Sequence, residues 1–156
     1  MKKLICFFVV LFCFFVEGMS QMLHSFRGED NRVVFKMADG ELQFYPLSSN
    51  TLRVKFVKQT LRMEMPEWIY VTSGKKEAFT IEDGKDVVSV VLSGIVAQVD
   101  KETGLITFLS PDGNMILQET ARQLTSSSVQ GMDTYCATQK FYSPEDEHLF
   151  GLGQFQ

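Results

Sequence analysis

Alternating apolar and polar residues run along most of the chain, and they predict β-strands. Residues 32–37 place Val33, Phe35 and Met37 on one face, and a period of two residues is the signature of a half-buried strand. The same kind of pattern predicts further strands at 41–46, 52–57, 67–71, 78–82, 87–92, 95–100, 105–110, 115–120 and 134–142, with a last one at 148–153. The chain is therefore expected to be β-structured nearly throughout.

Short turn sequences separate these strands. Asp-Gly pairs occur within 38–41, 83–86 and 111–114, and Thr-Gly closes 101–104. Such pairs accept positive φ at low cost and therefore favour tight hairpins. No window has the periodicity of a long amphipathic helix. Short strands joined by tight turns predict an all-β fold, an antiparallel sandwich or barrel.

The alternation also predicts the core. In three of the strands the inward residues are Leu42, Phe44, Leu52, Val54, Phe56, Ile95, Ala97 and Val99. The segments 87–92 and 105–109 carry apolar residues on both faces. They are expected to be central strands, covered on both sides within the sandwich or by another domain.

The first 20 residues have the layout of a secretory signal peptide. Two lysines precede an unbroken apolar run at 4–16, and the small residues Gly18 and Ser20 precede the expected cleavage site. The run is shorter than the roughly 20 residues that span a bilayer, although an uncleaved anchor is the alternative. The expected organisation is a signal peptide at 1–20, an N-terminal tail at 21–30 and a β-sandwich at 31–156.

Removal of the signal peptide changes the composition. Cys6 and Cys13 leave with it, so the mature chain keeps Cys136 alone and forms no internal disulfide. Two lysines and one glutamate leave as well, so that 15 basic and 19 acidic residues become 13 and 18, a net charge of −5. Because no basic block remains, nucleic acid and anionic membranes are poor partners. The roughly 135 residues left suit one domain.

Few residues point to chemistry. His24 and His148 lack metal-ligand spacing, and His24 is expected at the surface. Cys136 lies in a strand pattern, where a buried structural thiol is expected. The acidic run at 145–147 is expected to be solvated, because adjacent residues of an extended chain point apart and do not form a catalytic carboxylate pair. The aromatic residues that could stack on sugars, with core or edge packing as the alternative, are Tyr45, Trp68, Tyr70 and Tyr135.

The C-terminal sequence EDEHLFGLGQFQ (145–156) resembles the end of the N-terminal β-sandwich of glycoside hydrolase family 31. That domain commonly closes with Glu, an apolar residue, an aromatic residue, Gly-Leu-Gly and then Glu or Gln. The matching residues here are Glu147, Leu149, Phe150, Gly151, Leu152, Gly153 and Gln154. The segments 51–57 and 95–117 resemble an early strand and a hairpin of the same domain. The resemblance covers about residues 30–156 and implies a galactose-mutarotase-like sandwich.

The family contains α-glucosidases and α-xylosidases, in which the sandwich precedes a catalytic (β/α)₈ barrel. The barrel supplies two aspartates, a nucleophile in a Trp-x-Asp-Met-Asn-like motif and an acid/base. That motif is absent here, since Trp68 is followed by Ile69 and Tyr70. The resemblance therefore implies the non-catalytic front piece of an exported retaining exo-α-glycosidase, cut before the barrel and inactive alone. No catalytic residue and no metal or cofactor site is expected in this chain.

The resemblance also suggests which residues contact the barrel or lie near the substrate: Gly151, Gly153, Gln154 and Phe155. Glycines within a strand often mark the close approach of another backbone. Here they leave one face bare, where the barrel or a substrate loop could pack. A bulge or sheet corner inside the sandwich is the alternative. The ending Gln-Phe-Gln most resembles bacterial members grouped with α-xylosidases.

The export signal and the resemblance together imply a periplasmic or extracellular enzyme of a Gram-negative bacterium. The implied partners are α-linked glucoside or xyloside oligosaccharides and the intramolecular catalytic barrel, with no nucleic acid and no membrane after cleavage. Two other readings stay open. Aromatic residues on one sheet face would favour a free-standing carbohydrate-binding module, and an exposed apolar patch without sugar affinity would favour a non-catalytic surface or assembly sandwich.

Overall fold

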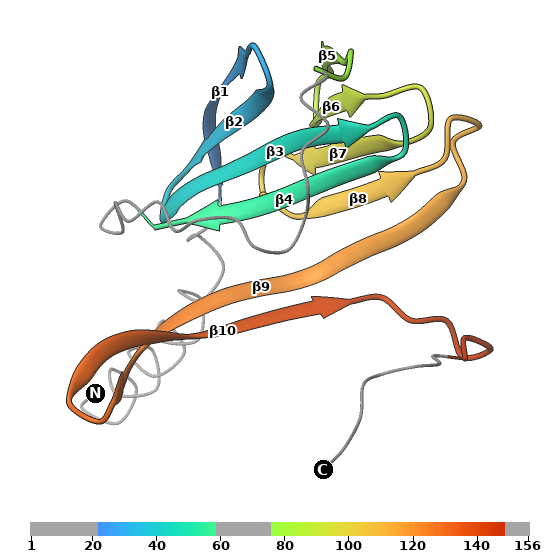
Figure 1. Ribbon diagram of the computed structural model, residues 1–156. Coiled ribbons are helices and arrows are strands. Elements are labelled where there is room, and N and C mark those ends of the chain that lie inside the picture. The colour runs from blue at the N-terminus through green and yellow to red at the C-terminus, as the bar shows by residue number, and fades with distance from the viewer. Residues whose placement is uncertain (1–21, 59–75, 149–156) are drawn as a thin grey trace, which may run out of the picture.

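The computed structural model describes residues 22–58 and 76–148, which form antiparallel β-strands (Figure 1). The strands are β1 (Leu23–Glu29), β2 (Arg32–Met37), β3 (Gly40–Ser48), β4 (Thr51–Val57), β5 (Thr80–Asp83), β6 (Val87–Val91), β7 (Val96–Asp100), β8 (Ile106–Leu109), β9 (Met115–Val129) and β10 (Met132–Phe141). One sheet has the order β1-β2-β3-β4 and the other β10-β9-β8-β7-β6-β5. The predicted all-β antiparallel class is confirmed. Within the described ranges, no helix has the length and hydropathy needed to cross a membrane.

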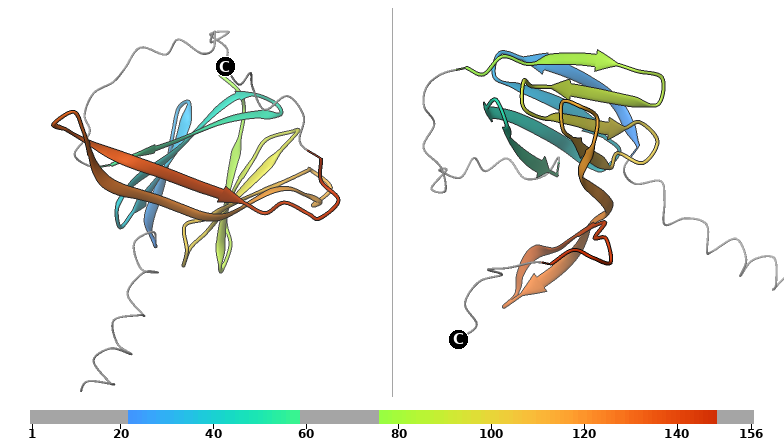
Figure 2. Two further views of the ribbon diagram at one scale, coloured as in Figure 1. Left: turned by 90° about the horizontal axis from the view of Figure 1, so that it is seen from below. Right: turned by 90° about the vertical axis from the view of Figure 1, so that its right-hand side faces the viewer.

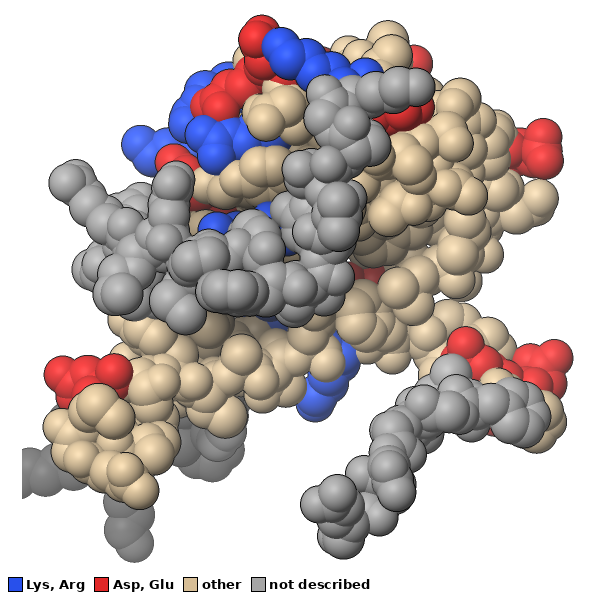
Figure 3. Space-filling view, in the orientation of Figure 1, with Lys and Arg blue, Asp and Glu red and all other residues tan. Residues whose placement is uncertain are grey.

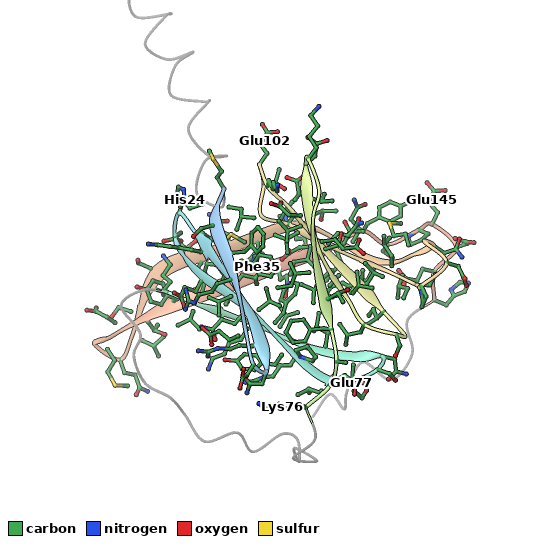
Figure 4. All side chains as sticks on the ribbon, turned by 90° about the horizontal axis from the view of Figure 1, so that it is seen from above. His24, Phe35, Lys76, Glu77, Glu102 and Glu145 are labelled. Carbon is green, nitrogen blue, oxygen red and sulfur yellow. The ribbon has the colours of Figure 1, made fainter. Side chains whose placement is uncertain are left out.

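The two sheets enclose one hydrophobic core. Phe35 lies between them (Figure 4), and its ring meets that of Phe44 edge-on with 5.0 Å between centroids. The other fully or almost fully buried members are Val33, Met37, Leu42, Val88, Val90, Leu92, Ala97, Val99 and Ile106. The predicted inward positions are confirmed, because those outside this set, Leu52, Val54, Phe56 and Ile95, pack against it while partly buried.

The two segments that are apolar on both faces form interior strands of the six-stranded sheet, as predicted. β6 lies between β5 and β7, and β8 lies between β7 and β9. Val88 and Val90 of β6 are fully buried. Val87 and Val91 are half-buried, so the outer face of this strand is partly covered within the described residues.

The turns follow the sequence prediction closely. The turns that contain Gly84, Gly104 and Gly113 connect β5 to β6, β7 to β8 and β8 to β9. Gly40 opens β3 with a φ of 151°, and a Cβ atom there would lie 2.5 Å from the carbonyl oxygen of Val57. Glycine is therefore required at this position both by the backbone conformation and by the neighbouring strand.

The expected N-terminal tail at 21–30 is largely a strand, and this part of the prediction is corrected. Leu23–Glu29 form β1, which pairs with β2. Leu23 and Phe26 both pack on the core although they are three residues apart. A register shift between Leu23 and Ser25 accounts for this spacing, because a bulge inserts one extra residue and breaks the period of two.

β9 is much longer than the predicted strand at 115–120. Its first residues pair with β8, and from Glu119 to Val129 it pairs with β10. From Glu119 on, β9 and β10 form a two-stranded hairpin at the edge of the six-stranded sheet, and it projects away from the other strands (Figure 2). Most of its residues are exposed on both faces. Its sequence therefore does not alternate between apolar and polar residues, and the strand predicted from the sequence ends at residue 120, well before the observed end of β9.

Several predictions lie outside the described residues. These are the signal peptide at 1–20, the strand at 67–71 with Trp68 and Tyr70, and nearly all of the strand at 148–153. The acidic run at 145–147 is exposed, as expected. His24 is exposed as expected too, although it belongs to β1.

Candidate functional site

The residues expected to contact a barrel or a substrate, Gly151, Gly153, Gln154 and Phe155, lie outside the described residues. The most distinctive surface of the described part is instead the projecting hairpin β9–β10. It has a buried polar anchor at its base, and exposed hydrophobic residues lie at its base and at its tip.

Glu119 is the centre of the anchor. It stands where β9 leaves β8 and joins β10, and it is 2% exposed. Its Oε2 accepts a hydrogen bond of 3.1 Å from the Ile106 backbone N–H of β8. Its Oε1 accepts one of 2.9 Å from the Gln139 side-chain amide of β10. One carboxylate therefore ties together three strands where the hairpin departs from the sandwich.

Arg122 completes the anchor on the same strand. Its side chain is 7% exposed, and its Nη2 atom lies 3.4 Å from Oε2 of Glu119. The same nitrogen donates a hydrogen bond to the Gly104 carbonyl oxygen, and the guanidinium lies 5.2 Å from the ring centroid of Phe56 on β4. Burial lowers the pKa of Arg122, and the charge of Glu119 opposes that shift.

The anchor links both sheets to the hairpin. Glu119 and Arg122 reach β8, the turn before it, β4 and β10. A buried charge pair is costly unless its partners are in place. The geometry therefore favours one orientation of the hairpin relative to the sandwich.

Most of the large exposed hydrophobic residues of the described part of the chain lie at the base and at the tip of the hairpin. Met22 is the one large exposed hydrophobic residue outside this region. The others, which we call the hairpin patch, are Met115, Ile116, Leu117, Val129, Met132, Phe141 and Tyr142. Figure 3 shows mainly uncharged side chains along the hairpin below the sandwich, whereas Lys and Arg gather near the far end of β1 and β2.

The tip of the hairpin is a tight two-residue turn. Gln130 and Gly131 have φ values of 51° and 78°, as in the type I′ turn that suits the twist of two paired strands. Val129 and Met132 face each other across this turn and are 56% and 67% exposed. The turn thus presents two apolar side chains at the outermost point of the hairpin.

Cys136 of β10 is exposed, so the prediction of a buried structural thiol is wrong. The strand pattern around it was correct, since the residue lies in the middle of β10. The error came from placing that strand inside the sandwich, whereas it belongs to the projecting hairpin.

A second polar cluster covers the outer face of the four-stranded sheet. Arg32 donates a 2.9 Å hydrogen bond to the Tyr45 hydroxyl, which donates in turn to the Gln43 side-chain oxygen at 2.8 Å. Arg32 also pairs with Glu29, which Arg27 approaches at 3.0 Å. These two arginines, Arg32 first, lower the pKa of the Glu29 carboxyl group. The cluster is an internally satisfied network on a sheet surface.

Tyr45 and Tyr135, the two sugar-stacking candidates within the described ranges, have cations over their rings. The guanidinium carbons of Arg32 and Arg53 lie 5.7 and 5.5 Å from the Tyr45 ring centroid. The Lys58 ammonium lies 4.8 Å from the ring centroid of Tyr135. Since these cations already lie over the rings, edge packing describes both residues better than a sugar platform does.

The described residues provide a buried polar anchor and exposed hydrophobic residues around the hairpin. In the described ranges, no three His, Cys, Asp or Glu residues come together as a metal site. Sequence reasoning missed the Glu119–Arg122 anchor entirely. The available signal was a Glu near the end of the predicted strand at 115–120 and an Arg just beyond it, and only the fold shows that both side chains are buried.

Comparisons with known proteins agree with this architecture. A family model described as the glycosyl hydrolase 31 N-terminal galactose mutarotase-like domain matches residues 41–155. Among solved structures, the chain is similar to the GH31 α-xylosidase of Xanthomonas citri, with a TM-score of 0.73 and 24% sequence identity. That match covers 83% of this chain and 15% of the xylosidase. At 24% identity the structural match supports the fold alone. The family model matches most of the sequence and therefore shows the family. The chain therefore belongs to the N-terminal galactose mutarotase-like domains of glycosyl hydrolase family 31.

Proposed function

We propose that this chain is the non-catalytic N-terminal domain of an exported retaining exo-α-glycosidase, of the α-glucosidase or α-xylosidase type. In the whole enzyme it packs on the catalytic barrel and helps shape the substrate entrance. The observation that carries the proposal is the family match over residues 41–155. The small share of the Xanthomonas citri α-xylosidase that the chain covers, 15%, supports a larger polypeptide around this domain.

The described surface is consistent with a supporting role. Its one buried carboxylate, Glu119, is engaged by a backbone N–H and a side-chain amide. A retaining glycosidase needs two carboxyl groups about 5–5.5 Å apart on either side of the bond it cleaves. Glu119 is committed to the hairpin anchor, so catalysis is assigned to the part of the enzyme that follows this domain.

Export is part of the proposal and rests on the N-terminal sequence. Two lysines followed by the apolar run at 4–16 favour secretion to the periplasm or beyond. N-terminal mass spectrometry of the protein made in a bacterial host tests this. A mature chain that begins near Gln21 supports it, and an intact Met1 in the membrane fraction contradicts it.

Activity measurements test the proposed role. The purified 156-residue chain is expected to leave aryl α-glucosides and α-xylosides intact, whereas the complete polypeptide that contains it hydrolyses one of them with retention at the anomeric carbon. Product anomers are followed by NMR. Turnover by the 156-residue chain that a single Asp or Glu substitution abolishes would overturn the proposal.

A further inference from the structure

β10 forms one edge of the six-stranded sheet. Within the described ranges β9 is its one neighbouring strand, and β10 lies at the outer rim of the described strands (Figure 1). Its pairing with β9 is regular from Met132 opposite Val129 to Lys140 opposite Ala121. The free side of an edge strand presents N–H and C=O groups that can pair with another strand. β10 therefore offers a long, uninterrupted row of such groups for strand addition.

The edges of the described sheets differ in how well they are protected against such pairing. β1 contains a bulge, β4 carries the charged residues Arg53 and Lys55, and β5 has only four residues, two of them acidic. Bulges, charges and short length all protect edge strands. The sequence of β10, MDTYCATQKF, contains neither proline nor glycine, and its two charged residues, Asp133 and Lys140, stand near its ends. The middle of this edge is thus uncharged and unprotected.

The tip of the hairpin determines which residues of β10 face the open side. In a two-residue hairpin the pair that closes the turn, here Val129 and Met132, is hydrogen-bonded. Hydrogen-bonded and non-hydrogen-bonded pairs then alternate along an antiparallel ladder. The residues that direct their N–H and C=O groups away from β9 are therefore Asp133, Tyr135, Ala137 and Gln139.

The hairpin patch indicates which strand is added, because it has two parts at opposite ends of the hairpin. The tip contains Val129 and Met132, and the shoulder, next to the anchor, contains Met115, Ile116, Leu117, Phe141 and Tyr142. When the same edge of two copies pairs in antiparallel fashion, the tip of each copy comes beside the shoulder of the other. A second copy therefore contacts both parts of the patch, and two-fold symmetry repeats the contact.

The register that fits this arrangement has Ala137 opposite its own counterpart. Met132 then lies opposite Tyr142 of the second copy, so that tip and shoulder meet. Centring the pair one residue earlier would place Met132 opposite Lys140 instead. A parallel pair in register would bring each charged residue next to its own counterpart, and like charges in facing positions are destabilising.

We infer that two copies of this chain form a two-fold symmetric dimer by pairing their β10 edges in antiparallel fashion around Ala137. The dimer joins the two six-stranded sheets into one continuous sheet. The Glu119–Arg122 anchor fixes the orientation of the hairpin and so presents this edge away from the sandwich. The inference concerns the 156-residue chain itself and does not depend on the proposed glycosidase role.

Sedimentation velocity of the purified chain at rising concentration, under reducing conditions, tests the dimer. Ala137→Pro removes an outward N–H from each copy and leaves the ladder with β9 in place, and Ala137→Lys sets two like charges opposite each other. Each substitution should raise the dimer dissociation constant by about tenfold or more. Gln123→Lys is the matched control, because Gln123 is exposed on β9 of the same hairpin, away from the open edge. Far-UV circular dichroism verifies that all variants remain folded.

Disulfide cross-linking tests the register. When Cys136→Ser is combined with Ala137→Cys, the two thiols of the dimer face each other, and the Cα atoms of such a pair lie about 5.5 Å apart. A disulfide spans that distance. In the unaltered chain the two Cys136 residues are diagonal neighbours, about 7–8 Å apart, beyond the usual range of a disulfide. Mild oxidation should therefore cross-link the double variant and leave the wild type monomeric on a non-reducing gel.

The outcomes decide both the dimer and its register. A dimer that both Ala137 substitutions weaken, together with cross-linking at position 137, would support the inference. A chain that stays monomeric at every concentration would overturn it, as would a dimer that both substitutions leave intact, because such a dimer forms through another surface. Faster cross-linking through Cys136 than through position 137 would overturn the register.

Discussion

Glu119→Gln is expected to destabilise the domain strongly, because the substitution removes one charge from a buried pair. The Arg122 guanidinium, 7% exposed and 3.4 Å from Oε2 of Glu119, would keep its charge in a site that excludes most water. Loss of one partner of a buried ion pair costs about 3–5 kcal/mol. The free energy of unfolding of a whole domain is only about 5–15 kcal/mol, so the effect is large.

The contribution of the pair itself follows from a double-mutant cycle. Arg122→Met leaves the Glu119 carboxylate buried with its Ile106 and Gln139 donors, and this single change is also expected to destabilise. The double variant removes both charges, and replacing a whole buried pair by uncharged groups is often close to neutral. We therefore expect the double variant to lose less free energy of unfolding than the sum of the two single losses, by about 1–3 kcal/mol.

Urea unfolding followed by far-UV circular dichroism measures all four chains. Glu82→Gln is the matched control, because Glu82 is exposed on β5, and its free energy of unfolding should change by less than about 0.5 kcal/mol. A Glu119→Gln midpoint equal to that of the control would refute the reasoning. Additivity of the two single variants would show that the charges do not interact.

Three further predictions concern other parts of the domain. Gly40→Ala should lower the free energy of unfolding by about 1–3 kcal/mol, because the residue has a φ of 151° and its Cβ would meet the Val57 carbonyl oxygen; thermal unfolding measures this, and an unchanged midpoint would contradict the backbone conformation. Cys136 should react with a chromogenic disulfide reagent in the native protein about as fast as a small free thiol does, since it is exposed; a requirement for denaturant would contradict its position. Glu29 has a lowered folded-state pKa because of Arg32 and Arg27, so it stabilises the fold above the unfolded-state pKa of about 4.3 and this contribution is lost as the pH falls through the lower folded-state value. The stability difference between the wild type and Glu29→Gln should therefore shrink on acidification below about pH 4, and a difference that stays constant down to pH 2 would contradict the linkage.

The sandwich was predictable wherever one strand face is buried and the other is not. In β7 buried and half-buried residues alternate along the whole strand, and in β2 the predicted inward residues are all buried, so these core residues could be identified from sequence alone. β1 could not, because the bulge after Leu23 changes which residues face the core. The outer part of β9 could not either, because a strand exposed on both faces has no apolar period to detect.

The anchor could not be predicted for a different reason. Glu119 meets donors that lie 13 and 20 residues away in sequence, at Ile106 and Gln139. No local pattern encodes such a meeting, and a charged residue in a strand is ordinarily expected to face water. The burial of Cys136 was mispredicted for a related reason, since local pattern cannot distinguish a strand within the sandwich from one that projects from it.

The central claim is that this domain belongs to a longer glycosidase. The most direct measurement is peptide mapping of the native polypeptide, captured from its source cells with an antibody raised against the 156-residue chain. The account predicts a polypeptide several times larger than 17.8 kDa, with peptides that continue past Gln156 into a catalytic domain. A native protein of 17.8 kDa or less whose last peptide ends at Gln156 would contradict it.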